Sequence, residues 1–204
     1  LYRLEQEFNR QGLKLSRQTM ANWLLKASEK WLQPVYDALH KRLCREPVLH
    51  ADGYQGYHRL PGNIRVVGCW AHARRKFDEA LSTLPQEKRK DSPAAIGECD
   101  CSRLFKLEQA LAELTPEERY EKRLEQEKPV LDALLSWANE MQVKTAPKSA
   151  MGRAIHYLLE QWPYLTRYLE DGRLELSNNR AERSIKPFVM GRKNWLFSNT
   201  PGGA

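Results

Sequence analysis

Only two stretches of the chain have the composition of β-strands, and this limits the sheet that the protein can build. The first is residues 47–51, which ends at the turn pair Asp52-Gly53, and the second is residues 64–70. From about residue 85 to residue 170, apolar residues recur at helical spacing between breaks rich in Pro, Lys and Glu. We therefore predict an α+β protein that is mostly helical, with a sheet reduced to a two-stranded hairpin.

The first 45 residues have the pattern of a helical DNA-binding region. An apolar helical face is broken at Gly12, and Ser16 is then a good N-cap for a second helix. A short helix, a turn and a second helix together suggest a helix-turn-helix. Its exposed face would carry three side chains that suit base edges or phosphates, namely Arg17, Gln18 and Asn22. The alternative is an ordinary helical hairpin with a polar outer side.

The chain has a basic charge balance. Lys and Arg outnumber Asp and Glu by 33 to 26, which gives a formal net charge of +7. Such a balance favours a polyanionic partner, although many basic proteins bind no nucleic acid.

The sequence has no apolar run of about 18 residues, so we expect no membrane partner. The four cysteines show no disulfide-framework spacing, which favours a cytoplasmic location. Cys69 and His72 could share a helix start, but a metal site there is the less favoured interpretation.

Two carboxylates stand out by their context. Asp52 follows a predicted strand, and Glu182 lies in the first turn of a predicted helix that Pro187 kinks or ends. The cations near Glu182 are Arg180, Arg183, Lys186, Arg192 and Lys193. Transfer of a phosphodiester needs carboxylates that converge on divalent metal, and neighbouring cations would hold the nucleic-acid backbone.

Each of these features also has a purely structural interpretation. Asp52-Gly53 is a common turn pair, and Glu182 stands three residues after Asn179, which is the spacing of a capping box. The basic run at residues 74–76 fits a solvated helix face as well as a DNA contact. Spacing alone therefore leaves the function open.

Four blocks of the sequence are long, ordered and specific. They are Asp52–Tyr57 (DGYQGY), Gly68–Phe77 (GCWAHARRKF), Asp171–Arg183 (DGRLELSNNRAER) and Gly191–Phe197 (GRKNWLF). Together they resemble signature blocks of the transposases of the insertion sequence sixty-six family, and the similarity covers nearly the whole chain. From this resemblance we expect a DNA transposase of the Asp-Asp-Glu (DDE) type, a protein of mobile elements that carries out DNA recombination.

The resemblance implies metal-dependent cleavage and strand transfer on double-stranded DNA, at transposon ends and in the target. It implies a ribonuclease-H-like catalytic core over residues 46–204, with a helical insertion at about 85–170, after a helix-turn-helix-like region at 1–45. The implied cofactor is Mg²⁺, with Mn²⁺ as an alternative. Besides DNA, the partners to expect are further copies of the chain or other transposon-encoded proteins.

The resemblance also assigns roles to individual residues. Asp52 matches the acid of the family's Asp-Gly-Tyr block, and Glu182 matches that of its Asn-Asn-Arg-Ala-Glu-Arg block, so both are expected to be catalytic and to bind metal. The residues expected to contact DNA are Arg17, Gln18, Asn22, Arg74, Arg75, Lys76, Arg180, Arg183, Arg192 and Lys193.

The chain departs from the family pattern at Asp52. Family members carry a first Asp, typically followed by Glu-Thr, tens of residues before the Asp-Gly-Tyr block, whereas one Asp stands here in the place of two. A ribonuclease-H-like sheet also has more strands than the two predicted. An internal deletion that joined two similar His-Ala-Asp segments would explain both facts. His50, Asp78 and Glu79 are poor substitutes for the lost acid, and residues 201–204 end where we expect the chain to continue. The two hypotheses are a working transposase and a catalytically inactive DNA-binding remnant of one.

Overall fold

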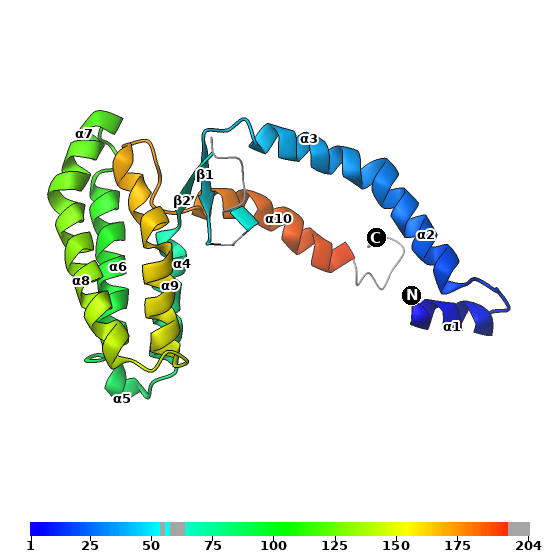
Figure 1. Ribbon diagram of the computed structural model, residues 1–204, viewed down its shortest axis with the longest axis horizontal. Coiled ribbons are helices and arrows are strands. Elements are labelled where there is room, and N and C mark those ends of the chain that lie inside the picture. Colours follow the sequence, from blue (N-terminus) through cyan, green and yellow to red (C-terminus); the bar gives the residue numbers. More distant parts are fainter. Residues whose placement is uncertain (54–55, 58–63, 196–204) are drawn as a thin grey trace. The chain divides into compact units, whose positions relative to one another are not determined.

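The computed structural model describes residues 1–53, 56, 57 and 64–195, without the side chains of residues 188 and 192–195. The chain divides into two compact units (Figure 1). The first, the N-terminal unit, is Leu1–Pro47 with Leu60–Ile64, and the second, the C-terminal unit, is Val48–Arg59 with Arg65–Ala204.

The secondary structure of the N-terminal unit is helical throughout its described residues. The helices are α1 (Tyr2–Arg10), α2 (Arg17–Ala27), a π-helical turn (Ser28–Leu32) and α3 (Gln33–Leu43). Ser16 begins α2, because its hydroxyl accepts a hydrogen bond from the amide of Thr19 at 3.1 Å. From α2 onwards the helices follow one another without a break, so residues 17–43 form one long helix that is widened at the π turn.

The N-terminal unit has almost no core of its own. Among residues 1–47, only Met20 is buried. The large hydrophobic side chains that stay exposed there are Leu1, Tyr2, Leu4, Leu13, Trp23, Leu24, Leu25, Trp31, Leu32, Val35, Tyr36 and Leu39. Because an amphipathic helix draws most of its stability from burying its apolar face, these helices gain little from packing within the unit.

The C-terminal unit contains a parallel pair of short strands, β1 (Val48–Ala51) and β2 (Arg65–Gly68). Both strands lie where the sequence predicts them, and Val48 pairs with Arg65 while Ala51 pairs with Gly68. The predicted hairpin is wrong, because the two strands run in the same direction. Parallel strands need a crossover connection of about a dozen residues, and residues 52–64 are long enough to supply one.

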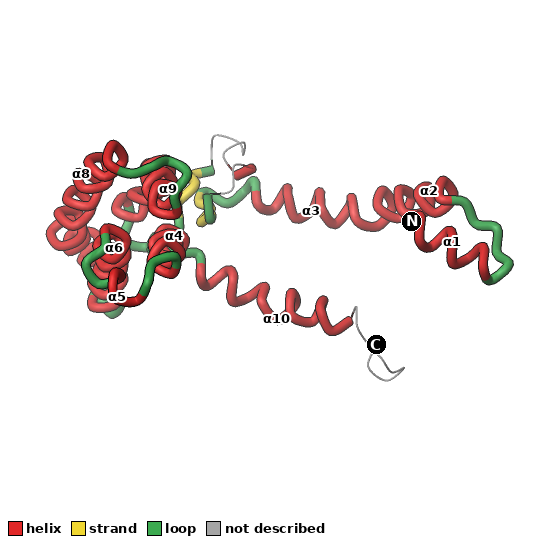
Figure 2. Tube along the Cα trace, turned by 90° about the horizontal axis from the view of Figure 1, so that it is seen from below, coloured by secondary structure: helices red, strands yellow, loops and turns green. Residues whose placement is uncertain are grey.

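Helices make up most of the C-terminal unit (Figures 1 and 2). They are α4 (Trp70–Ser82), α5 (Gln86–Arg89), α6 (Pro93–Ala110), α7 (Pro116–Lys122), a π turn (Arg123–Glu127), α8 (Lys128–Lys144), α9 (Ala150–Leu165), a 3₁₀ turn (Thr166–Glu170) and α10 (Asn179–Trp195). Hydroxyl groups of Ser92, Thr115 and Ser149 cap the starts of α6, α7 and α9. The last helix continues through Pro187, which therefore does not end it.

The core of the C-terminal unit lies among α4, α6, α8 and α9, which pack against one another (Figure 2). Fully buried side chains from all four helices meet there, including Phe77, Leu104, Leu134 and Leu158. Val67 joins this core from β2, so the small sheet is anchored to the helices. The described residues thus form a mostly helical α+β protein, and the predicted class is confirmed.

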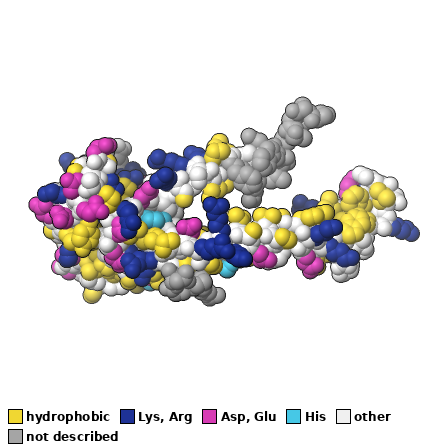
Figure 3. Space-filling model, turned by 90° about the horizontal axis from the view of Figure 1, so that it is seen from above, with side chains coloured by type: hydrophobic (Ala, Val, Ile, Leu, Met, Phe, Trp, Pro, Cys, Tyr) yellow, Lys and Arg dark blue, Asp and Glu magenta, His cyan; other side chains and the backbone are white. Residues whose placement is uncertain are grey.

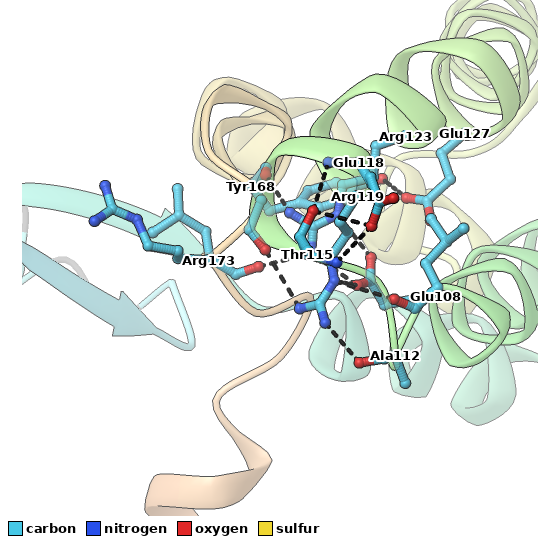
Figure 4. A network of polar contacts seen from close by, with 12 residues as sticks. Glu108, Ala112, Thr115, Glu118, Arg119, Arg123, Glu127, Tyr168 and Arg173 are labelled. Atoms are coloured by element: carbon cyan, nitrogen blue, oxygen red, sulfur yellow. Dashed lines mark hydrogen bonds and ion pairs between the residues drawn. The ribbon is translucent and has the colours of Figure 1, made fainter.

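A buried arginine ties together the segment that leads toward α10 (Figure 4). The guanidinium of Arg123 is fully buried and donates two hydrogen bonds to the carboxylate of Glu108, at 2.9 and 2.7 Å. It also donates to the carbonyl oxygens of Tyr168 and Leu174, each at 2.8 Å. The hydroxyl of Tyr168 in turn donates to the buried carboxylate of Glu127 at 2.6 Å. These hydrogen bonds hold residues 168–174, the segment that precedes α10, against the π turn at Arg123–Glu127 and against α6.

Candidate functional site

The carboxyl ends of the two parallel strands form the candidate site. Asp52 directly follows β1 and is exposed, while Cys69 directly follows β2 and is buried. The amide of Trp70 donates to the carbonyl of Leu176 at 3.1 Å, and the amide of Asn178 donates to Cys69 Sγ at 3.4 Å. The segment that begins α10 is therefore joined to the end of β2, at the sheet edge where α/β proteins commonly bind ligands.

The junction between β2 and α4 is held against α9. Trp70 is fully buried, its indole N–H donates to the carbonyl of Leu165 at 2.9 Å, and its ring meets Trp162 edge-on at 5.9 Å. A side chain on Gly68 would place its Cβ 2.9 Å from the backbone nitrogen of Leu165. Only a glycine lets β2 approach α9 this closely.

Helix α9 also positions Asp52. The hydroxyl of Tyr157 donates to the backbone carbonyl of Asp52 at 2.8 Å. Gly53 has a φ of +83°, and a Cβ there would lie 2.9 Å from the side chain of Gln161. Burial raises the pKa of Tyr157, and the neighbouring charge of Asp52 raises it further. The hydroxyl of Tyr157 therefore keeps its proton and donates it to Asp52 in a hydrogen bond.

Glu182 lies in the first turn of α10 and faces α4. Its Oε1 lies 3.6 Å from His72 Nε2, and its amide donates to the carbonyl of Asn178 at 3.1 Å. Burial raises the pKa of Cys69, and the charge of Glu182 adds to that effect. The carboxylate of Glu182 thus has a defined neighbour in His72, which the sequence singled out only for a disfavoured metal site.

Three buried polar atoms near these residues have no hydrogen-bond partner among the described residues. They are His50 Nδ1, His72 Nδ1 and Asn178 Oδ1. His50 belongs to β1, and burial lowers its pKa, so its neutral form is favoured. Buried polar groups are usually hydrogen-bonded, so these three atoms are available to a ligand that reaches this end of the sheet.

The predicted DNA-contacting residues of the C-terminal unit lie on α4 and α10. Arg74 and Arg75 are exposed on α4, and the guanidinium of Arg74 stacks over the ring of Phe105 at 5.0 Å. Lys76 pairs with Glu79 at 3.2 Å, and Arg180 pairs with Glu175 at 3.3 Å.

Arg183 and Lys186 are exposed on α10 and line, with Glu182, a hollow of about 600 Å³. The side chains of Arg192 and Lys193 lie outside the described residues.

The three predicted DNA-contacting residues of the N-terminal unit are in part engaged with one another and with α1. Arg17 Nε lies 2.8 Å from Glu5 Oε2, and its guanidinium sits 5.4 Å from the centre of the Tyr2 ring. Gln18 donates to the side-chain oxygen of Asn22 at 3.0 Å. Arg17 therefore joins α2 to α1, a role that the sequence did not predict.

Comparison with known proteins identifies the family. The sequence model of the transposase IS66 family matches residues 1–53 and, separately, residues 48–204. The chain belongs to the transposase IS66 family. The resemblance found in its sequence blocks is thereby confirmed, and the two matches share residues 48–53.

Two curated relatives of this transposase-family chain come from Sinorhizobium fredii. The uncharacterized protein y4hP is 31% identical over 170 residues, which cover 77% of this chain and 31% of the relative. The uncharacterized protein y4qI is 34% identical over 166 residues, which cover 76% of this chain and 30% of the relative. The chain thus matches about a third of the length of these relatives. No solved structure matches it.

The residues that the structure describes in this transposase-family chain do not fit a complete metal centre. Within the described ranges, no three His, Cys, Asp or Glu side chains converge in a way that could hold a metal ion. Asp78 and Glu79 are exposed on α4, and Glu79 is paired with Lys76. Asp52 follows β1, whereas Glu182 contacts His72 at the start of α4. None of the helices described is both long and apolar enough to cross a membrane.

Proposed function

We propose that this chain is a DNA-binding remnant of an IS66 transposase whose catalytic site is incomplete. The observation that carries the proposal is the double match of residues 48–53, the segment VLHADG. A deletion that joined two similar His-Ala-Asp segments would let one segment match the family twice. Such a deletion would leave Asp52 in the place of two separate acids.

The parallel strand pair supports an origin in a ribonuclease-H-like core. The strands β1 and β2 are parallel, and parallel strands linked by a crossover are typical of α/β folds. An antiparallel hairpin, in contrast, would not have pointed to an α/β fold. In this proposal residues 46–204 are the core remnant, and residues 85–170 are its helical insertion. Residues 1–45 are the DNA-binding region, although the six-residue connection from Gln11 to Ser16 is longer than the three to four residues of a standard helix-turn-helix.

Asp52 and Glu182 are the proposed ligands for Mg²⁺ or Mn²⁺. A two-metal site for phosphodiester transfer holds its ions about 3.5–4 Å apart and needs several carboxylate oxygens to offset their charge. Two carboxylates leave that charge poorly compensated, and the described residues supply no third one. We therefore propose DNA binding without strand cleavage.

Double-stranded DNA, at transposon ends and in target DNA, is the proposed partner. Arg183 and Lys186 carry the strongest support among the basic residues, because both are exposed and line one hollow on α10 with Glu182. The remaining proposed contacts are Arg17, Gln18, Asn22, Arg74, Arg75, Lys76, Arg180, Arg192 and Lys193.

A salt titration of DNA binding tests the proposal. The slope of log affinity against log salt is about −0.9 for each phosphate that the protein neutralises. Replacing Arg183 and Lys186 together with Ala should make the slope shallower by about 2, because two phosphate contacts are lost. Lys128→Ala with Lys144→Ala is the matched control, since both lysines are exposed on α8. Absence of binding at low salt, or equal losses in the two double variants, would refute the proposal.

The N-terminal contacts are tested by sequence preference. Gln18→Ala with Asn22→Ala should weaken binding to transposon-end DNA more than binding to random DNA, because base contacts specify and phosphate contacts position. Each lost bidentate base contact should cost about 1–3 kcal/mol. Equal losses on the two DNAs would favour the helical-hairpin interpretation of residues 1–45.

An active transposase is the second candidate function. The observation that favours it is the region around the strand ends, where three buried polar atoms have no hydrogen-bond partner among the residues that the structure describes. In this candidate, a group such as His50 Nδ1 serves as the third metal ligand beside Asp52 and Glu182. A DNA-cleavage assay separates this candidate from the inactive remnant.

A further inference from the structure

The backbone of residues 168–174, here called the strap, is attached to α7 and to the π turn that follows α7. The guanidinium of Arg123 donates hydrogen bonds at 2.8–3.0 Å to the carbonyl oxygens of three strap residues, Tyr168, Asp171 and Leu174. Arg119 of α7 donates to the carbonyl of Gly172 at 3.3 Å. Residues 175–178 lead from the strap to α10, so the strap is one of the attachments of that helix to the core.

Two carboxyl groups flank the guanidinium that holds the strap (Figure 4). Both oxygens of Glu108 accept hydrogen bonds from Arg123, at 2.9 and 2.7 Å, and Glu127 Oε2 accepts one from the hydroxyl of Tyr168 at 2.6 Å. Glu127 is fully buried, and no donor among the described residues reaches its Oε1. A carboxylate oxygen can only accept, so a buried oxygen without a donor favours the protonated acid, which can itself donate.

Ionisation of Glu127 places a second negative charge inside this cluster. Burial raises the pKa of Glu127 to about 7, the charge of Glu108 and a hydrogen bond between the two carboxyl groups add to the rise, and the hydrogen bond from Tyr168 opposes it. While Glu127 is protonated, Glu108 and Arg123 form a neutral pair at 2.7 Å. A buried charge without a partner is costly, so the ionised form is disfavoured for as long as the cluster stays closed.

The charges on the neighbouring helices compensate an ionised Glu127 only weakly. Acidic and basic side chains are interspersed over the helices of the C-terminal unit, at the left of Figure 3, where water screens them. On α8, Lys128 pairs with Asp132 at 2.6 Å at the surface. Arg119 of α7 lies 3.9 Å from Glu108 on α6 and is itself partly exposed. Arg123 is therefore the buried cation that faces Glu127, and its N–H groups already hold Glu108 and the strap.

We propose that the strap is a pH-sensitive switch, which is closed while Glu127 holds a proton and opens away from the core when Glu127 loses it. An ionised Glu127 repels Glu108 and attracts Arg123 away from the strap carbonyls. The strap and α7 line a hollow of about 570 Å³, which gives water a path to the strap. Opening hydrates both carboxylates and so removes the cost of the buried charge. Burial raises the pKa of Tyr168, so its hydroxyl keeps its proton and the change comes from Glu127.

Hydrogen exchange of the full chain, measured by mass spectrometry without DNA, tests the switch. Opening returns the pKa of Glu127 from about 7 toward its ordinary 4.5. The closed strap is therefore most stable below pH 4.5 and loses that stability as the pH rises through 7. The protection factor of residues 168–174 should fall by on the order of 50-fold between pH 5 and pH 8. Peptides from residues 154–165 in α9 should keep their protection, because the core stays folded when the strap opens.

Three variants identify the group that controls the strap. Glu127→Gln keeps the shape and the donor of the protonated acid, so its strap should stay protected at pH 8. Glu125→Gln, on the same turn but mostly exposed, should behave like the natural chain. Tyr168→Phe removes the hydrogen bond that opposes the rise in the pKa of Glu127, so the midpoint of the change should move to higher pH. Equal loss of protection in the natural chain and in Glu127→Gln would overturn the proposal, as would loss in residues 154–165 together with the strap.

Discussion

The two units of this chain are both helical but differ in what stabilises them. The C-terminal unit has a cluster of fully buried side chains among four helices, whereas residues 1–47 bury only Met20. The same helical periodicity therefore has two outcomes. In one unit the apolar faces meet within the chain, and in the other most of the large apolar side chains stay exposed. Substitutions of apolar residues should consequently destabilise the C-terminal unit more than the N-terminal unit.

The largest effect on folding is expected at Arg123. Arg123→Ala would leave Glu108 without its buried partner and should lower the free energy of unfolding by about 3–5 kcal/mol. Arg173→Ala is the matched control, because Arg173 is largely exposed and pairs with Asp171 at the surface. That variant should lose about 1 kcal/mol or less. Urea unfolding measures both, and similar losses would contradict the assignment of Arg123 to the core.

Glu127 should make the stability of the C-terminal unit depend on pH. Burial raises the pKa of Glu127 to about 7 in the folded chain from an ordinary 4.5, although hydrogen bonding from Tyr168 opposes that rise. The folded state thus holds the proton more tightly, so the stability gained below pH 4.5 is lost as the pH rises through 7.

Relative to Glu127→Gln, the natural chain should therefore lose on the order of 3 kcal/mol of unfolding free energy between pH 4.5 and pH 8. Glu125→Gln is the control, since Glu125 lies on the same turn and is mostly exposed. If the unfolding free energies of the natural chain and of Glu127→Gln changed with pH in the same way, Glu127 would not be the source of the pH dependence.

Replacing one glycine in each unit tests whether the two units unfold independently. A Cβ on Gly172 would overlap the carbonyl of Pro116, so Gly172→Ala should lower the unfolding free energy by about 1–3 kcal/mol. Gly12 has a φ of +81° with open space around it, so Gly12→Ala should strain only the turn between α1 and α2. The main thermal transition should shift for Gly172→Ala and stay in place for Gly12→Ala. A shift of that transition by Gly12→Ala would mean that the two units unfold together.

Most of the fold was predictable because the patterns that specify it are local. The strand at residues 48–51, the strand at 65–68 and the cap at Ser16 all follow from short stretches of sequence. The direction of the strand pair was not predictable, because it depends on the path of residues 52–64. The burial of Arg123 was also missed, since its partners lie up to 51 residues away and come together only through packing.

The candidate site was predictable only in part. The sequence identified Asp52 and Glu182 by their positions at a strand end and in a helix start. Their neighbours Tyr157 and His72 were not assigned to them, because each contact joins residues more than 100 positions apart. The roles of Asp52, Glu182 and the basic residues stay predictions, as does the division into a DNA-binding region and a catalytic remnant.

The most direct test of the central claim is a strand-cleavage assay on transposon-end DNA with Mg²⁺ or Mn²⁺. The chain should bind this DNA with strong salt dependence and leave every strand intact, because a missing metal ligand weakens the site and a misplacement of about 1 Å can cost on the order of 10²-fold in rate. Glu182→Ala should bind DNA in the same way and be equally inactive. Metal-dependent cleavage by the natural chain that disappears in Glu182→Ala would show a working catalytic site and would contradict the account.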